Sequence, residues 1–142
     1  MGYTHYWYRK KEISQYVYSQ IKSDFQKLLP AFTQAGVVLA GARGLGDPLL
    51  TDHDLRFNGR GRDSYEEFDF PRVLTLRSWD EPDERGHFQF CKTAERPYDL
   101  AVTSLLLIAK HHLQQDFTIG SDGGAEDWEA ARKLCQMHLG FS

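Results

Sequence analysis

The segment from Phe90 to His112, FCKTAERPYDLAVTSLLLIAKHH, carries the residue types in this chain that are best suited to chemistry. Its pattern predicts the end of a strand followed by a buried helix, and helix N-termini attract anions through their unpaired N–H groups. Lys92 and Arg96 would add positive charge and Thr93 a hydroxyl, so this corner could hold a phosphate or a carboxylate. The alternative is structural: Thr93 caps a turn, and Arg96 and Asp99 form a local ion pair.

Cys91 lies in the same corner, where a helix N-terminus would lower the pKa of its thiol. A catalytic thiol also needs a partner base, and the sequence places none beside it. We therefore interpret Cys91 as a small core residue on a strand. The other cysteine, Cys135, is too distant in the sequence to form a metal-binding pattern with it.

A second corner of the same kind is IGSDGGAEDW, from Ile119 to Trp128. Ser121 and Asp122 could cap the last helix through their side-chain oxygens, and the two glycines that follow allow close backbone approach. Trp128 could then face a ligand. The plainer interpretation is a helix N-cap followed by acidic residues in the first turn.

A glycine-rich stretch, AGARGLGDP at residues 40–48, does not match a nucleotide-binding loop. It has no Gly-Lys-Ser/Thr ending, and no helix follows it as the dinucleotide fingerprint requires. An ordinary connector is the favoured interpretation, although a mobile loop could bring Arg43 to a pocket.

The histidines do not predict a metal site. His111 and His112 are adjacent near the end of a helix and point in different directions, and His53 alternates with its acidic neighbours on a strand. No paired-histidine or paired-cysteine motif occurs in the sequence, and no cofactor is expected. The sequence leaves a serine–histidine–acid triad as an alternative, but it contains no nucleophile elbow that would support one.

The elements that must position these residues follow from hydrophobic periodicity. One helix is predicted from Glu12 to Ala35; Pro30 should kink it or end it near Leu29 with a short second turn beyond, and Gly36 is the natural stop. A central helix begins near Pro97, and an amphipathic helix runs from 125 to 139. Strands are predicted at 2–9, 37–40, 53–57, 65–70, 73–76, 87–92 and 116–120, with a turn at Asn58-Gly59 and an acidic loop at 78–86.

This order, with strands grouped between helices, predicts an α+β fold. We expect a mainly antiparallel sheet of about five or six strands packed against three helices. The length of 142 residues suits one compact domain, residues 1–142.

Composition excludes several classes of protein. The formal net charge of −3 argues against a general nucleic-acid binder. No signal peptide is visible, and the longest apolar run is too short to cross a membrane, so a cytoplasmic protein is expected. Aromatic residues make up 13% of the chain and gather near its start, which suits a dimer interface as well as a pocket wall.

Four stretches together resemble an uncharacterised group of small phage, prophage and bacterial proteins. They are MGYTHYW at 1–7, FNG at 57–59, FCKTAERPYD at 90–99 and SDGGAEDW at 121–128. The resemblance carries over no catalytic residue. It implies a phage-type context, in which small acidic cytoplasmic proteins often disarm host defences. They bind a defence protein, or they sequester or destroy a nucleotide-derived immune signal.

Three functional hypotheses follow. The first is a pocket at the helix N-termini that sequesters a nucleotide-like signal, between aromatic rings and cationic side chains. Its expected ligand-binding residues are His5, Tyr6, Trp7, Arg43, Lys92, Thr93, Arg96, Tyr98, Asp99, Ser121, Asp122 and Trp128. The second is a hydrolase or phosphodiesterase that uses His5, Cys91, Asp99 and Asp122. The third is an inhibitor that binds a host defence protein through Trp79 in the acidic loop.

Overall fold

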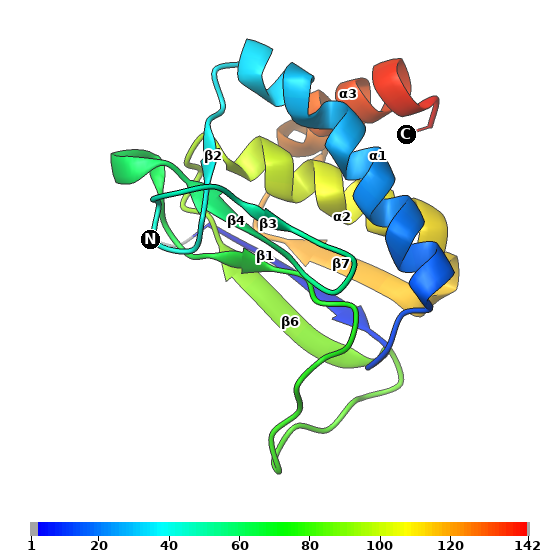
Figure 1. Cartoon of the computed structure of the whole chain (residues 1–142). Helices are drawn as coiled ribbons and strands as arrows, with labels where there is room; N and C mark the ends of the chain where they lie inside the picture. Colours follow the sequence, from blue (N-terminus) through cyan, green and yellow to red (C-terminus); the bar gives the residue numbers. More distant parts are fainter. Residues whose placement is uncertain (1–2, 142) are drawn as a thin grey trace.

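The structure, a computed structural model, describes residues 3–141. It is α+β with antiparallel strand pairing, which confirms the predicted fold class. Figure 1 shows the helices gathered on one side of the strands. The helices are α1 (Gln15–Gln34), α2 (Asp99–Leu113) and α3 (Glu129–Leu139), with short 3-10 turns η1 (Gly61–Asp63), η2 (Gln114–Asp116) and η3 (Ala125–Trp128). The strands are β1 (Thr4–Arg9), β2 (Leu39–Ala40), β3 (Leu49–Leu50), β4 (Leu55–Gly59), β5 (Phe68–Asp69), β6 (His87–Lys92) and β7 (Phe117–Ser121).

The strands form two sheets rather than the one that was expected. The first has the order β6-β1-β7, so the N-terminal strand lies between two strands from the second half of the chain. Within β1, His5, Trp7 and Arg9 are buried against the helices, and the alternate residues face outward. The second sheet consists of β2-β4-β3, with β5 also paired to β4.

Side-chain hydrogen bonds explain where several predicted boundaries differ from the structure. The chain at 73–76 forms only an isolated bridge between Val73 and Glu12, so the strand predicted there is wrong. Asn58 and Gly59 are the last two residues of β4 and not a turn. The side-chain amide of Asn58 donates to the carbonyls of Ala42 and Tyr65, and its Oδ1 accepts from the N–H of Tyr65. Those bonds satisfy a side chain that is 1% exposed.

The helices match their predicted periods, with different ends. Ser14 caps α1 by accepting from the N–H of Val17, and the helix continues through Pro30 to Gln34. An end of the helix at Leu29 is therefore wrong, because packing of the apolar face outweighs the backbone hydrogen bond that Pro30 cannot make. Gly36, with φ of +81°, follows the helix end as expected.

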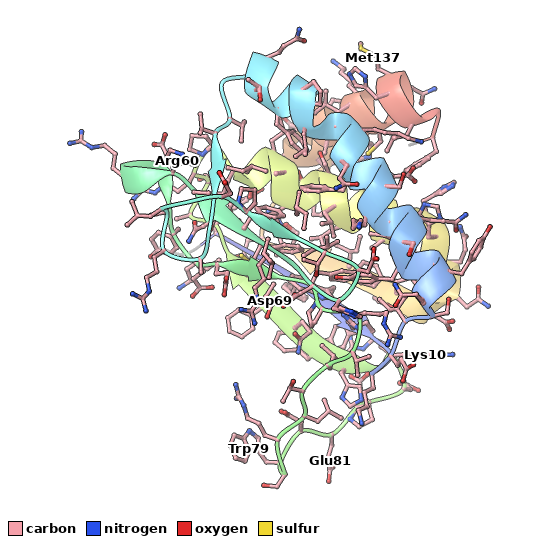
Figure 2. The ribbon with its side chains drawn as sticks, viewed as in Figure 1. Lys10, Arg60, Asp69, Trp79, Glu81 and Met137 are labelled. Carbon is pink, nitrogen blue, oxygen red and sulfur yellow. The ribbon has the colours of Figure 1, made fainter. Side chains whose placement is uncertain are left out.

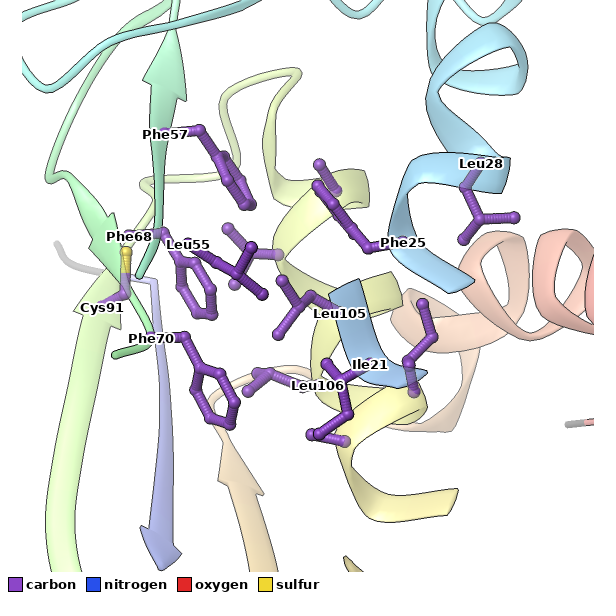
Figure 3. Close-up of a cluster of buried hydrophobic side chains, with 14 of the residues drawn as sticks. Ile21, Phe25, Leu28, Leu55, Phe57, Phe68, Phe70, Cys91, Leu105 and Leu106 are labelled. Carbon is purple, nitrogen blue, oxygen red and sulfur yellow. The ribbon is translucent and has the colours of Figure 1, made fainter. Parts of the chain in front are cut away.

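The core lies between α1, α2 and the two sheets. Phe25 stacks on Phe57 with ring centroids 5.3 Å apart, and Phe68 stacks on Phe70 at 6.3 Å (Figure 3). Helix α2 is buried on most sides, as its nearly all-round apolar pattern predicted. Among residues 3–141, no helix has the length and apolar character that a membrane span requires.

Candidate functional site

Three chain segments that are remote in sequence meet at His5. The register of the first sheet places His5 opposite Cys91 on β6 and opposite Ser121 on β7. The loop after β6 leads directly into α2, whose first residue is Asp99. The two helix-entry corners that the sequence analysis identified are therefore adjacent, and His5 lies between them.

His5 links the two corners through both ring nitrogens. Its Nε2 lies 2.6 Å from Oδ1 of Asp99, and its Nδ1 lies 2.7 Å from Oγ of Ser121. A carboxylate can only accept hydrogen bonds, so Nε2 carries a hydrogen, and in the neutral ring Nδ1 then accepts from the Ser121 hydroxyl. Thr93 donates a further bond to Asp99 at 2.5 Å. The result is a continuous chain of hydrogen bonds from α2 to the end of β7.

The end of β7 is held by further bonds. The N–H of Gly123 donates to Oγ of Ser121 at 2.9 Å, and the N–H of Thr4 donates to the carboxylate of Asp122 at 3.0 Å. The rings of Tyr3 and Trp128 each pack edge-on against His5 with centroids 5.1 Å apart. These contacts leave His5 fully buried, at 0% exposure.

The bonds of Ser121 and Asp122 also correct their predicted role. The expected N-cap of the last helix is wrong at these positions, because Ser121 bonds to His5 and Asp122 to Thr4. Instead, η3 begins after Gly124, whose N–H donates to Asp127 at 2.9 Å. The continuous helix predicted over 125–139 is split accordingly into η3 and α3.

The electrostatic environment of this corner is acidic. Burial, together with the negative charges of Asp99, Asp127 and Glu95, raises the pKa of Tyr3 to about 12. A phosphate placed beside Tyr3 would meet the same negative field. The chemistry of the corner therefore suits hydroxyl and N–H donors better than anions.

A cavity of about 380 Å³ opens beside Ser121. We call it the Ser121 pocket; its lining residues are Leu107, Ile119, Gly120, Ser121, Gly123, Gly124, Ala125, Trp128 and Arg132. Arg132 is the only cationic residue among them. Its guanidinium donates to the carbonyl of Ala125 at 2.9 Å and lies 3.7 Å from the carboxylate of Glu129.

The three cations expected in the pocket lie elsewhere. Lys92 alternates with Cys91 on β6, so its side chain leaves the opposite face of the sheet from His5. Arg96 is exposed, with its guanidinium 5.9 Å from the ring of Tyr65. Arg43 is exposed in the loop after β2. None of the three lines the Ser121 pocket.

Three of the expected aromatic residues also lie outside the Ser121 pocket. Trp7 is buried in the core beside Phe68, with ring centroids 5.3 Å apart. Tyr98 is fully buried, and its hydroxyl donates to the carbonyl of Glu66 at 2.6 Å. Tyr6 packs on the outer face of the sheet. The structure therefore brings together His5, Thr93, Asp99, Ser121, Asp122 and Trp128 from the predicted set.

Cys91 is confirmed as a core residue. It is 1% exposed, and burial raises the pKa of its thiol to about 12, the reverse of what a reactive thiol needs.

Trp79, by contrast, is 70% exposed near the tip of a loop that projects away from the sheets (Figure 2).

Sequence reasoning missed Arg132 and the outer face of β6. Arg132 follows Trp128 by four residues, and that spacing places both on one side of a helix, which is a signal the sequence does contain. Phe88 and Phe90 were assigned only to a strand. They line a second cavity, of about 670 Å³, at the free edge of β6.

Comparisons with known proteins returned nothing that assigns a function: no family model, no curated protein and no solved structure matches this chain. The resemblance to phage and prophage proteins therefore stays a prediction. The site must be interpreted from its own geometry.

Proposed function

We propose that this protein binds a nucleotide-derived small molecule in the Ser121 pocket and retains it without cleavage. A pocket of about 380 Å³ lies in the range of small-molecule sites. Its apolar wall includes Leu107, Ile119 and Trp128, and its polar groups are Ser121 and Arg132. In this proposal the sugar hydroxyls of the ligand face the acidic corner beside Ser121, and a phosphate pairs with Arg132.

The observation that carries the proposal is the fixed position of Ser121. Its hydroxyl is bonded to His5 on one side and to the N–H of Gly123 on the other, and His5 is anchored in turn by Asp99. A polar group that is already held in place loses little conformational entropy when a ligand binds. Such a group suits recognition of a small molecule at high affinity.

Burial of His5 favours retention over cleavage. A general base that activates a serine must also deliver a proton to the leaving group, so its ring has to reach the substrate. His5 is 0% exposed beneath Tyr3, Ser121 and Trp128. The N–H of Gly123 also donates to the serine oxygen, which makes that oxygen a weaker nucleophile.

A hydrolase is the second candidate, because the Ser121–His5–Asp99 contacts of 2.7 and 2.6 Å match the order of groups in a serine–histidine–acid triad. The hydrolase candidate predicts two results that retention does not. A fluorophosphonate would label Ser121, and incubation with the ligand would yield a cleaved product.

In a phage-type context, retention of an immune signal would lower its free concentration in the host cytoplasm. That role, the cytoplasmic location and a homo-oligomeric state are part of the proposal and rest on the sequence. The counter-defence role depends on the identity of the ligand, so the first experiment must find it.

The test is a thermal-shift screen with nucleosides, mononucleotides, cyclic oligonucleotides and adenine-dinucleotide derivatives, because a ligand raises the melting temperature by an amount that grows with the logarithm of its concentration divided by its dissociation constant. A ligand that is found is then recovered from the heated protein and weighed by mass spectrometry. Intact ligand supports retention, and a product of lower mass supports the hydrolase.

The variant Arg132→Gln locates the site. We expect it to weaken binding of a phosphate-bearing ligand about tenfold or more, because a charge-assisted bond is lost. The matched control is Lys133→Gln, one residue along α3, because Lys133 does not line the Ser121 pocket. Equal loss in both variants, or no stabilising ligand in the whole panel, would contradict the proposal.

A further inference from the structure

The largest cavity described above lies away from the Ser121 pocket, at the free edge of β6. It has a volume of about 670 Å³ and separates Phe88, Gln89 and Phe90 on one wall from residues 53–56 and 69–80 on the other. We call it the β6 groove. At one end the walls meet, because the N–H of Glu66 donates to the carbonyl of Lys92 at 3.3 Å. Asp69, labelled in Figure 2, belongs to the opposite wall.

The backbone of β6 turns unused hydrogen-bonding groups into this groove. The N–H of Thr93 donates to the carbonyl of Tyr3, so Thr93, Cys91 and Gln89 bond to β1. The alternate residues direct their N–H and C=O groups to the other side, as Lys92 shows by bonding to Glu66. Phe90 and Phe88 therefore direct theirs into the groove. The carbonyl of Phe88 accepts only the side-chain amide of Gln89, at 2.9 Å.

Aromatic side chains extend from the edge over the outer face of the sheet. Phe88 is 50% exposed and Phe90 is 57% exposed, with ring centroids 5.9 Å apart. Tyr6 and Tyr8 of β1 continue the surface, at 5.9 and 5.4 Å from Phe88. An edge strand that combines free backbone groups with exposed aromatic residues is a site where another strand can add.

The opposite wall carries a surplus of negative charge. Arg56 alone bridges Asp54 at 2.8 Å and Asp69 at 3.3 Å. Arg77 and Asp80 also line this wall, together with His53. Two guanidinium groups thus face three carboxyl groups, so a cationic side chain would complete the pairing when all three are ionised. A nucleic-acid phosphate would meet charge of its own sign.

We infer that the β6 groove binds an extended peptide segment of a partner protein, which adds as a strand to β6. Apolar side chains of the peptide would pack on Phe88 and Phe90, and a lysine or arginine would pair with Asp54 and Asp69. A second copy of this chain fits less well, because pairing two β6 edges would bring the two acidic walls beside them together. The inference is independent of the ligand proposed for the Ser121 pocket.

The probe is a fluorescein-labelled peptide of seven residues that alternates valine with lysine, read by fluorescence anisotropy. A peptide with glutamate in place of lysine is the matched control. We expect the lysine peptide to bind about tenfold more tightly, and the double variant Asp54→Asn/Asp69→Asn to remove that preference. Equal binding of the two peptides to the unaltered protein would overturn the inference.

Amide hydrogen exchange then locates the peptide on the strand. The N–H groups of Phe88 and Phe90 should gain protection when the lysine peptide binds, whereas those of Gln89 and Cys91, already bonded to β1, should not change. Protection elsewhere, with Phe88 and Phe90 unaffected, would overturn the inference. Two other results would also overturn the inference. One is a dimer in solution that protects the Phe88 and Phe90 amides without peptide, and the other is protection of these amides by a single-stranded oligonucleotide.

Discussion

At the scale of single residues, burial decides which chemically suggestive side chains are reactive. Cys91 stands at the entrance of α2, where the field of a helix would lower its pKa, yet its side chain points into the core. Burial raises the pKa of Cys91 to about 12 and that of Cys135 to about 11. The loss of hydration outweighs the helix terminus because a thiolate in apolar surroundings has nothing to replace its water.

Both thiols should therefore resist alkylation in the folded protein. At pH 8 with iodoacetamide, we expect modification of Cys91 at least about a hundredfold more slowly than in the chain unfolded by guanidinium, because the thiolate fraction is small and access is blocked. Mass spectrometry of the adduct over time gives the rate, and a Cys135→Ser variant isolates Cys91. Labelling of the native protein within minutes would contradict this prediction and show that the segment around Cys91 opens to solvent.

At the scale of elements, the site depends on how β1, β7 and the start of η3 meet. Gly123 lies where the turn after β7 passes beneath Tyr3: a Cβ built on it would lie 2.0 Å from the Tyr3 hydroxyl oxygen. Nothing lies within 4 Å of a Cβ built on its neighbour Gly124. The two adjacent glycines thus differ in what surrounds them.

The variant Gly123→Ala should displace Tyr3 and disturb the bond from the Gly123 N–H to Ser121. We expect a loss of about 1–3 kcal/mol in the free energy of unfolding, measured with urea, together with weaker binding of any ligand of the Ser121 pocket. Gly124→Ala is the control and should change stability by less than about 0.5 kcal/mol. Similar losses of stability in both variants would mean that the conformation of the turn, and not the contact with Tyr3, causes the destabilisation.

The same elements show what the sequence could and could not predict. Periodicity found α1, α2 and the last helix, because a helix spaces its buried residues locally. It also found the two corners that contain Asp99 and Ser121. It could not place His5 between them, since that depends on strand register across 94 and 116 residues of sequence. The strands predicted at 37–40 and 65–70 contain β2 and β5, whereas β3, predicted as a turn, is defined by its pairing with β4 and carries little pattern of its own.

At the scale of the whole molecule, the two sheets separate beyond the contact of Glu66 with Lys92 and leave the β6 groove between them. The groove exposes carboxylates that a single continuous sheet would have covered. Burial and the neighbouring Asp69 raise the pKa of Asp54 from 3.8 to about 7, although Arg56 lowers it. Asp52, in the loop after β3, shows the reverse, because Lys22 of α1 lowers its pKa.

The raised pKa of Asp54 makes stability depend on pH. Between pH 4 and pH 7 the folded chain holds a proton that the unfolded chain releases, so the free energy of unfolding falls as pH rises through this range. Asp54→Asn removes the charge and therefore the slope. Since the side chain is 19% exposed, the full shift is discounted. We expect the variant to gain on the order of 1–2 kcal/mol relative to the unaltered protein between pH 4.5 and pH 8.

Urea unfolding at pH 4.5, 6 and 8 measures this gain. The control is Asp52→Asn, two residues away, where the lowered pKa makes the sign opposite: the stabilisation by Asp52 is lost only as pH falls below about 4, so this variant and the unaltered protein should run parallel from pH 4.5 to pH 8. If the curves for Asp54→Asn and the unaltered protein run parallel, the two carboxylates are not held close enough to share a proton. Both would then be ionised at neutral pH, and the acidic wall of the β6 groove would offer a stronger pairing to a lysine or arginine, because each carboxylate would carry its full negative charge.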